Sequence, residues 1–118
     1  MPERKISAYV KDTLNSIERI EQYSADFSFE DFTTNFMAIE ACLYNIQIIG
    51  KAVSKIPNGL KSNTPHIPWV LIKGMRNRLI HEYFGTDYLL VWNVINNELP
   101  ALKTELVKVY SSLIEENK

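Results

Sequence analysis

The stretch that decides the fold is FEDFTTNFMAIEACLYNIQIIGKAVSK, residues 29–55. Apolar or small side chains recur along it at alternating steps of four and three residues, namely Phe32, Phe36, Ile39, Leu43, Ile46, Gly50 and Val53. This spacing keeps one side of an α-helix apolar over three heptads. A second row runs beside it, formed by Met37, Ala41, Tyr44 and Ile48. A helix that is apolar on two sides must be covered on two sides, by another helix or by another copy of the protein.

The flanking segments also have a helical period. Residues 3–24 form an amphipathic pattern, with one apolar stripe of Ile6, Tyr9, Val10, Leu14, Ile17, Ile20 and Tyr23. Proline and glycine cluster in KIPNGLKSNTPHIP, which predicts a polar loop over 56–67. Pro68 suits the first turn of a third helix, which Gly85 would end. Thr86 or Asp87 would cap a fourth helix, and Pro100 would open a fifth.

These patterns predict the fold class. No segment alternates with period two, so we expect no sheet. The 118 residues, 46% of them apolar and 23% charged, suit one folded domain over 1–118. We therefore predict an all-α, up-and-down bundle of about five helices.

Charge and cysteine content exclude several classes of protein. Thirteen basic and fourteen acidic side chains give a net charge of −1, which excludes binding of nucleic acid through bulk charge. Cys42 is the only cysteine, so an internal disulfide is impossible and a reducing compartment is favoured. The first residues, MPERKISAYV, lack the apolar core of a signal peptide, and the apolar run IQIIGKAV is too short to span a bilayer. We expect a cytoplasmic protein without a membrane segment.

The candidate site is RNRLIHEYF, residues 76–84, in the expected third helix. Arg76 falls within an apolar stripe, where a charge must be paired, reach outward or serve a site. His81 follows five residues later, about 140° around an ideal helix axis, so the two side chains do not share a narrow face. Each residue also has a structural explanation: a paired arginine, a histidine at a helix C-terminus and, for Tyr83, a core tyrosine. The residues alone leave both interpretations open.

A basic cluster surrounds this candidate site. Lys73, Arg76 and Arg78 lie within six residues, and Lys51, Lys55 and Lys61 could approach them in the fold. Such a cluster can bind phosphate, although a charge run is also typical of a solvated face. The sequence has no metal-binding spacing of the HExxH, CxxC or EF-hand type and no glycine-rich phosphate loop. We therefore expect neither a metal nor a cofactor.

The string Arg76-Asn77-x-x-x-His81-x-Tyr83 resembles the signature of the HepT-like toxins, within the HEPN class of helical ribonucleases. The segment PWVLIKGMRNRLIHEYFGTD is similar to the core of that family, and IIGKAV resembles its Ile-Gly-x-Ala helix. The segments ERIEQYS and NELP fit as well, so the resemblance spans nearly the whole chain. Lys51 stands where the family often has an acidic residue, which puts in doubt any salt bridge made there.

The resemblance implies a HEPN-like homodimer that cuts RNA without a metal. Arg76 and His81 would be the catalytic residues, with Asn77 as a supporting polar group. The implied partner is an MntA-type nucleotidyltransferase antitoxin, which would transfer AMP from ATP to Tyr83 and silence the toxin in a type VII-like toxin–antitoxin pair. Lys73 and Arg78 would contact RNA phosphates.

Two other functions remain open from the sequence. The chain could be a non-catalytic helical subunit that docks on a nucleotidyltransferase and presents substrate to it. It could also be a purely structural bundle, in which replacing Arg76 or His81 alters stability alone. Cleavage of RNA that depends on His81 separates the nuclease from both.

Overall fold

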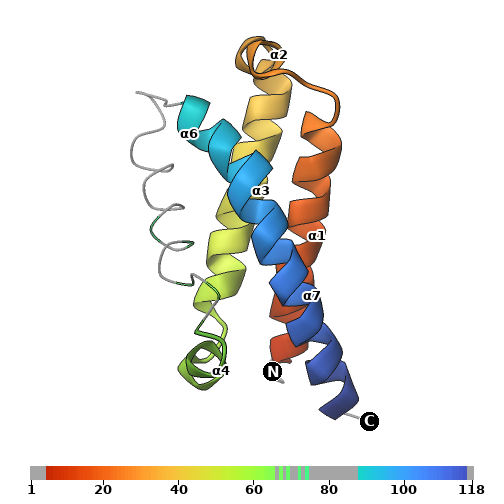
Figure 1. The fold of residues 1–118 in the computed structure, drawn as a ribbon, viewed down its shortest axis with the longest axis vertical. Coiled ribbons are helices and arrows are strands. Elements are labelled where there is room, and N and C mark those ends of the chain that lie inside the picture. Colours follow the sequence, from red (N-terminus) through yellow and green to blue (C-terminus); the bar gives the residue numbers. More distant parts are fainter. Residues whose placement is uncertain are drawn as a thin grey trace.

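The computed structural model describes residues 5–65, 67, 69, 72, 74 and 88–116, and in this part of the chain all regular structure is helical. The elements are α1 (Ile6–Ser24), α2 (Phe29–Thr34), α3 (Phe36–Ser54), α4 (Asn58–Asn63), α6 (Tyr88–Asn93), the π-helical segment η2 (Val94–Glu98) and α7 (Leu99–Glu116) (Figure 1). The structure confirms the predicted all-α bundle.

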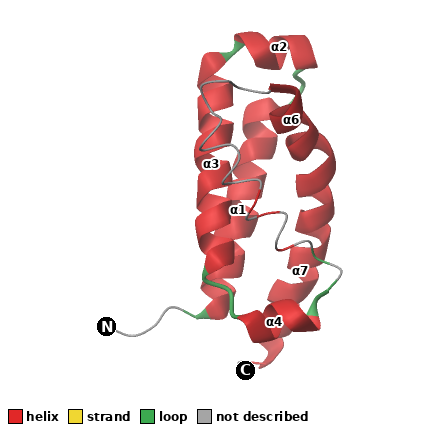
Figure 2. Ribbon diagram, turned by 90° about the vertical axis from the view of Figure 1, so that its left-hand side faces the viewer, coloured by secondary structure: helices red, strands yellow, loops and turns green. Residues whose placement is uncertain are grey.

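Three long helices build the bundle. α1 and α3 lie side by side along their whole length, and α7 packs against α1 (Figures 1 and 2). The short α2 lies across one end of the bundle and α4 lies at the other (Figure 2). The apolar stripes predicted for the first and second segments meet in one core, whose fully buried members include Val10, Ile17, Phe32, Ile46, Ile49, Val91 and Leu106.

The predicted single helix over 29–55 is wrong, because Asn35 divides it into α2 and α3. Ser28 and Asp31 form a capping box that starts α2. Asn35 has φ −102° and ψ 88°, and its side-chain oxygen accepts a hydrogen bond from the Ala38 N–H at 3.0 Å, which starts α3. The break turns Phe36 outward, with 66% of its surface exposed. The spacing of apolar residues had placed Phe36 on the apolar side of the predicted helix.

The predicted loop over 56–67 contains a helix, α4 (Asn58–Asn63). Pro57 precedes this helix with φ −64°, and its missing N–H removes no helical hydrogen bond at that position. Proline therefore starts a helical turn here instead of preventing one. Ile56 and Ile67 are both buried, so the two ends of this connection are fixed to the core.

The fourth and fifth predicted helices are one continuous helical segment from Tyr88 to Glu116. Pro100 is the second residue of α7 and does not open a separate helix. It has no N–H to donate to the carbonyl of Asn96, and its ring would collide with that carbonyl in an ideal α-helix. The turn before it widens accordingly, and the Leu99 N–H donates to the Val94 carbonyl five residues back. The caps predicted at Gly85, Thr86 and Asp87 lie outside the described residues.

α3 is long and apolar enough to cross a membrane by length and composition, which the sequence analysis did not anticipate. More than half of its apolar window, 56%, is buried inside the bundle. A core helix of a globular protein passes the same test of length and composition. The packing of α3 against α1 thus accounts for its apolar character.

Candidate functional site

The predicted site residues are Lys73, Arg76, Asn77, Arg78, His81 and Tyr83, and all six lie outside the described residues. The roles and geometry expected for them therefore stay predictions. The structure instead places the chain that leads into this segment and the basic residues expected near it.

The chain leading into the motif is anchored in the core. Ile67, Trp69 and Ile72 are buried and belong to the core cluster. The indole N–H of Trp69 donates to the Thr64 hydroxyl at 3.0 Å, and that hydroxyl donates to the Leu60 carbonyl at 2.9 Å. This chain of hydrogen bonds joins α4 to the start of the motif segment. Ile72 is fixed four residues before Arg76.

Two of the predicted basic residues line a groove between α1 and α3. Lys51 lies in the last turn of α3, Lys55 is the C-cap residue of the same helix, and both are exposed. With Tyr9, Asp12, Ile48 and Ala52 they line an open groove of about 420 Å³. Among the described residues, no ion pair of either ammonium group is observed. Two like charges one turn apart repel each other, so an anion bound between them would relieve that repulsion.

The charges of the bundle are segregated along α3, a feature that the net charge of −1 conceals. Residues 24–50 contain no lysine, arginine or histidine, and their acidic residues are Asp26, Glu30, Asp31 and Glu40. Lys51, Lys55 and Lys61 follow in the next eleven residues. Along residues 24–61 the acidic side chains therefore come first, through α2 and the first half of α3, and the basic side chains follow, from the last turn of α3 through α4.

Cys42 is a free cysteine that is buried in the core. Burial raises the pKa of its thiol to about 12, so it stays protonated and unreactive at neutral pH. Among the described residues, no three histidine, cysteine, aspartate or glutamate side chains come together in a group that could hold a metal ion.

Comparison with known proteins identifies the family. The model of the family described as "Ribonuclease HepT-like" matches residues 13–109. The chain is 39% identical over 115 residues to "Putative RNase MJ0125" of Methanocaldococcus jannaschii, covering 98% of this chain and 99% of that protein. It is 37% identical over 101 residues to "Probable ribonuclease HepT" of Thermococcus cleftensis, covering 86% of this chain and 92% of that protein. No solved structure gave a significant match.

The matched region runs from α1 through the motif segment into α7 and so includes every helix of the core. Both of these relatives are covered over more than nine tenths of their length. The chain therefore belongs to the HepT-like ribonuclease family.

Proposed function

We propose that this protein is a metal-independent endoribonuclease toxin whose catalytic residues are Arg76 and His81, with Asn77 as a supporting polar group. The observation that carries the proposal is the intact string Arg76-Asn77-x-x-x-His81-x-Tyr83 in a chain that belongs to a ribonuclease family. The buried anchors Trp69 and Ile72 support it, because they hold the chain that leads into this string.

The chemistry follows from the side chains. RNA carries its own nucleophile, the 2′-hydroxyl, which attacks the adjacent phosphorus while the bond to the 5′-oxygen breaks. His81 carries an imidazole, the group that most often serves as acid or base in catalysis, so it can accept the 2′-hydroxyl proton or donate a proton to the leaving 5′-oxygen. Arg76 stabilises the charge that develops on the phosphate oxygens. The products are a 2′,3′-cyclic phosphate and a 5′-hydroxyl.

A homodimer completes this site in the proposal. One histidine does not readily serve as base and acid in the same step, whereas two copies in one cleft provide both groups. A shared cleft also lets Arg76 of one subunit act with His81 of the other, which removes the difficulty of their separation around the helix axis. Lys73 and Arg78 contact flanking phosphates.

Regulation acts at Tyr83 in the same proposal. A cognate MntA-type nucleotidyltransferase transfers AMP from ATP to the tyrosine hydroxyl and releases pyrophosphate. Each added nucleotide brings a negatively charged phosphate to within two residues of His81, where the RNA phosphate must bind. Both proteins act in the cytoplasm as a toxin–antitoxin pair. The tyrosine hydroxyl accepts the AMP, and Tyr83→Phe lacks it. This variant is therefore expected to cleave RNA and to stay active when the partner and ATP are added.

The deciding experiment compares RNA cleavage by the wild type and by His81→Ala in the presence of EDTA. Intact mass first establishes that Tyr83 carries no adduct. His66→Ala is the matched control, because His66 is the only other histidine and lies outside the motif. Cleavage that survives EDTA, survives His66→Ala and disappears in His81→Ala supports the nuclease. Absence of cleavage by the folded, unmodified wild type across several RNA classes overturns it and favours a docking subunit of a nucleotidyltransferase.

A further inference from the structure

The groove between α1 and α3 combines a basic part, an apolar part and a single carboxylate. α1 and α3 run in opposite directions, so the first half of α1 meets the second half of α3 (Figure 1). We call this hollow the α1–α3 groove, and its lining residues are Tyr9, Asp12, Ile48, Lys51, Ala52 and Lys55. Its volume of about 420 Å³ lies within the range of sites that hold a small organic molecule.

The basic part of the α1–α3 groove fits a phosphate group. Lys51 and Lys55 are exposed and lie four residues apart, which places them on one side of the helix. Asp12 is the only acidic lining residue, so the lining carries two positive charges and one negative charge. A phosphate accepts hydrogen bonds from both ammonium groups and offsets the repulsion between them.

The apolar part of the groove has no use for a phosphate alone. Ile48 and Ala52 supply an aliphatic surface on α3, and Tyr9 supplies an aromatic ring on α1. Tyr9 is half-buried and packs against the core, which holds its ring in place. A tyrosine ring fixed beside basic side chains is a platform on which any nucleic-acid base can stack.

The remaining group of the groove selects for hydroxyls. The Asp12 carboxylate repels phosphate but accepts hydrogen bonds, and ribose hydroxyls are donors that carboxylates bind in nucleotide sites. We propose that the α1–α3 groove binds a ribonucleotide. Its phosphate lies between Lys51 and Lys55, a ribose hydroxyl donates to Asp12, and the base packs against Tyr9.

This inference goes beyond the proposed function, because it involves no residue of the string at 76–84 and no cleavage step. The ribonucleotide is either a free nucleotide or one unit of an RNA strand, since both present the same three groups. A mononucleotide such as 5′-AMP has no internucleotide bond to cut. Its binding is therefore measured independently of the proposed nuclease activity, and either proposal can fail alone.

The test is calorimetric titration of the whole chain with 5′-AMP. The expected dissociation constant is about 10 µM to 1 mM, as for a ligand of this size in an open site. Adenosine lacks the phosphate, and inorganic phosphate lacks the base, so each is expected to bind at least about tenfold more weakly. Deoxy-AMP, which lacks the 2′-hydroxyl, tests the role of Asp12. Amide chemical shifts are expected to change at residues 9–12 and 48–55.

Four variants assign the three contacts. Lys51→Gln and Lys55→Gln keep the length of the side chain and are each expected to weaken 5′-AMP binding about tenfold. Tyr9→Leu keeps an apolar side chain, and is expected to weaken 5′-AMP about fivefold or more without changing the affinity for phosphate. Asp12→Asn is expected to bind phosphate more tightly and to discriminate less between AMP and deoxy-AMP, a combination that a loss of folding would not produce.

A matched control separates the groove from general charge effects. Lys108→Gln removes one positive charge from an exposed position on α7 and is expected to leave 5′-AMP binding unchanged. Circular dichroism confirms that each variant is folded. Absence of 5′-AMP binding at about 10 mM, binding that survives Lys51→Gln/Lys55→Gln, or adenosine that binds as tightly as 5′-AMP would each overturn the proposal.

A second titration distinguishes the two sources of the ribonucleotide. It uses a short oligoadenylate with a 5′-phosphate and the His81→Ala variant, in which the proposed nuclease cannot consume the RNA. Binding tighter than that of 5′-AMP, and weakened by Lys51→Gln, assigns the groove to an RNA strand. Equal or weaker binding assigns it to a free nucleotide.

Discussion

The indole N–H of Trp69 donates to the hydroxyl of Thr64 at 3.0 Å, five residues earlier in the chain. Both residues lie between α4 and the segment that contains the motif, and Trp69 is buried. The bond satisfies a polar group that would otherwise be buried without a partner. It therefore fixes the direction in which the chain enters the motif segment.

Trp69→Phe keeps an aromatic ring in the core but removes this donor. The change is expected to cost about 1 to 3 kcal/mol in free energy of unfolding, since the ring is also smaller. Denaturant unfolding measures the cost. Thr64→Ser is the control, because it retains the hydroxyl and should preserve the bond. Thr64→Val removes the hydroxyl. If it destabilises the protein no more than Thr64→Ser does, the hydrogen bond contributes nothing to the free energy of unfolding.

Asn35 ends α2 and caps α3, so its replacement should weaken the corner between them. Asn35→Ala removes the side-chain oxygen that accepts the Ala38 N–H and is expected to cost about 1 kcal/mol in free energy of unfolding. Asn35→Asp retains an acceptor and should preserve most of the stability. Thermal unfolding measures both variants. If Asn35→Ala is as stable as the wild type, the break between α2 and α3 is caused by packing and not by the cap.

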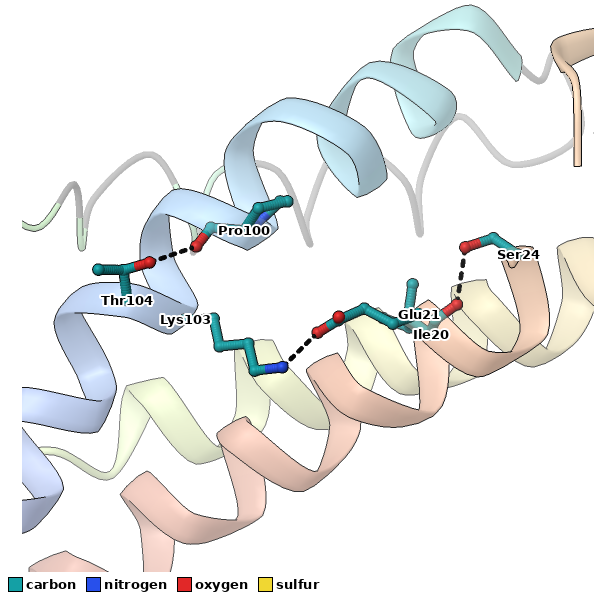
Figure 3. Close-up of polar contacts among 6 residues, drawn as sticks. All are labelled: Ile20, Glu21, Ser24, Pro100, Lys103 and Thr104. Carbon is teal, nitrogen blue, oxygen red and sulfur yellow. Dashed lines mark hydrogen bonds and ion pairs between the residues drawn. The ribbon is translucent and has the colours of Figure 1, made fainter. Parts of the chain in front are cut away.

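Lys103 of α7 and Glu21 of α1 form an ion pair, with 2.9 Å between Nζ and Oε1 (Figure 3). The hydrogen bond to Glu21 raises the pKa of Lys103 above its ordinary value of 10.5. The site is largely exposed and screened by solvent, so Lys103→Met is expected to cost less than about 1 kcal/mol in free energy of unfolding at pH 7.

The sign of the pH dependence follows from that shift. A lysine whose pKa is higher in the folded state stabilises the fold below its ordinary pKa, and this contribution disappears as the pH rises through the folded-state value. The stability of wild type and Lys103→Met should therefore converge as the pH rises above 10.5 and through the raised pKa of Lys103, and also at high salt. A constant difference at all pH and salt values would mean that the methylene groups of Lys103, not its charge, stabilise the contact.

The Cys42 thiol should react only when the protein unfolds. Its pKa of about 12 leaves almost no thiolate at pH 8, and its side chain is fully buried. Alkylation by iodoacetamide, followed by intact mass, is expected to be slow in buffer and fast in denaturant. Rapid alkylation of the folded protein would show that α3 opens locally near Cys42.

The periodicity of the sequence predicted the helical class and most of the core because burial on α1 and α3 repeats every three to four residues. It missed the break at Asn35 because the apolar spacing from Phe32 to Phe36 runs through it. The signal that could have revealed the break is the capping box at Ser28 and Asp31, followed by a second capping residue. α4 was missed because it is only six residues long and has no buried residue to give a period.

The candidate site depended on resemblance for a different reason. Periodicity places Arg76 in an apolar stripe, but an arginine there is explained equally well by a structural ion pair. Family membership supports the nuclease interpretation, and the positions of Arg76 and His81 lie outside the described residues. The segregation of charge along α3 was present in the sequence, but summing the charges to −1 concealed it.

The burial of Cys42 has a practical consequence for measuring this protein. Because it is the only cysteine, the folded chain offers no accessible thiol to a maleimide or a spin label. A single cysteine introduced on the exposed side of α3, for example in place of Tyr44, would carry one probe per chain. The buried Cys42 could stay in place. Distances between two such probes would then report directly how copies of the protein are arranged in solution.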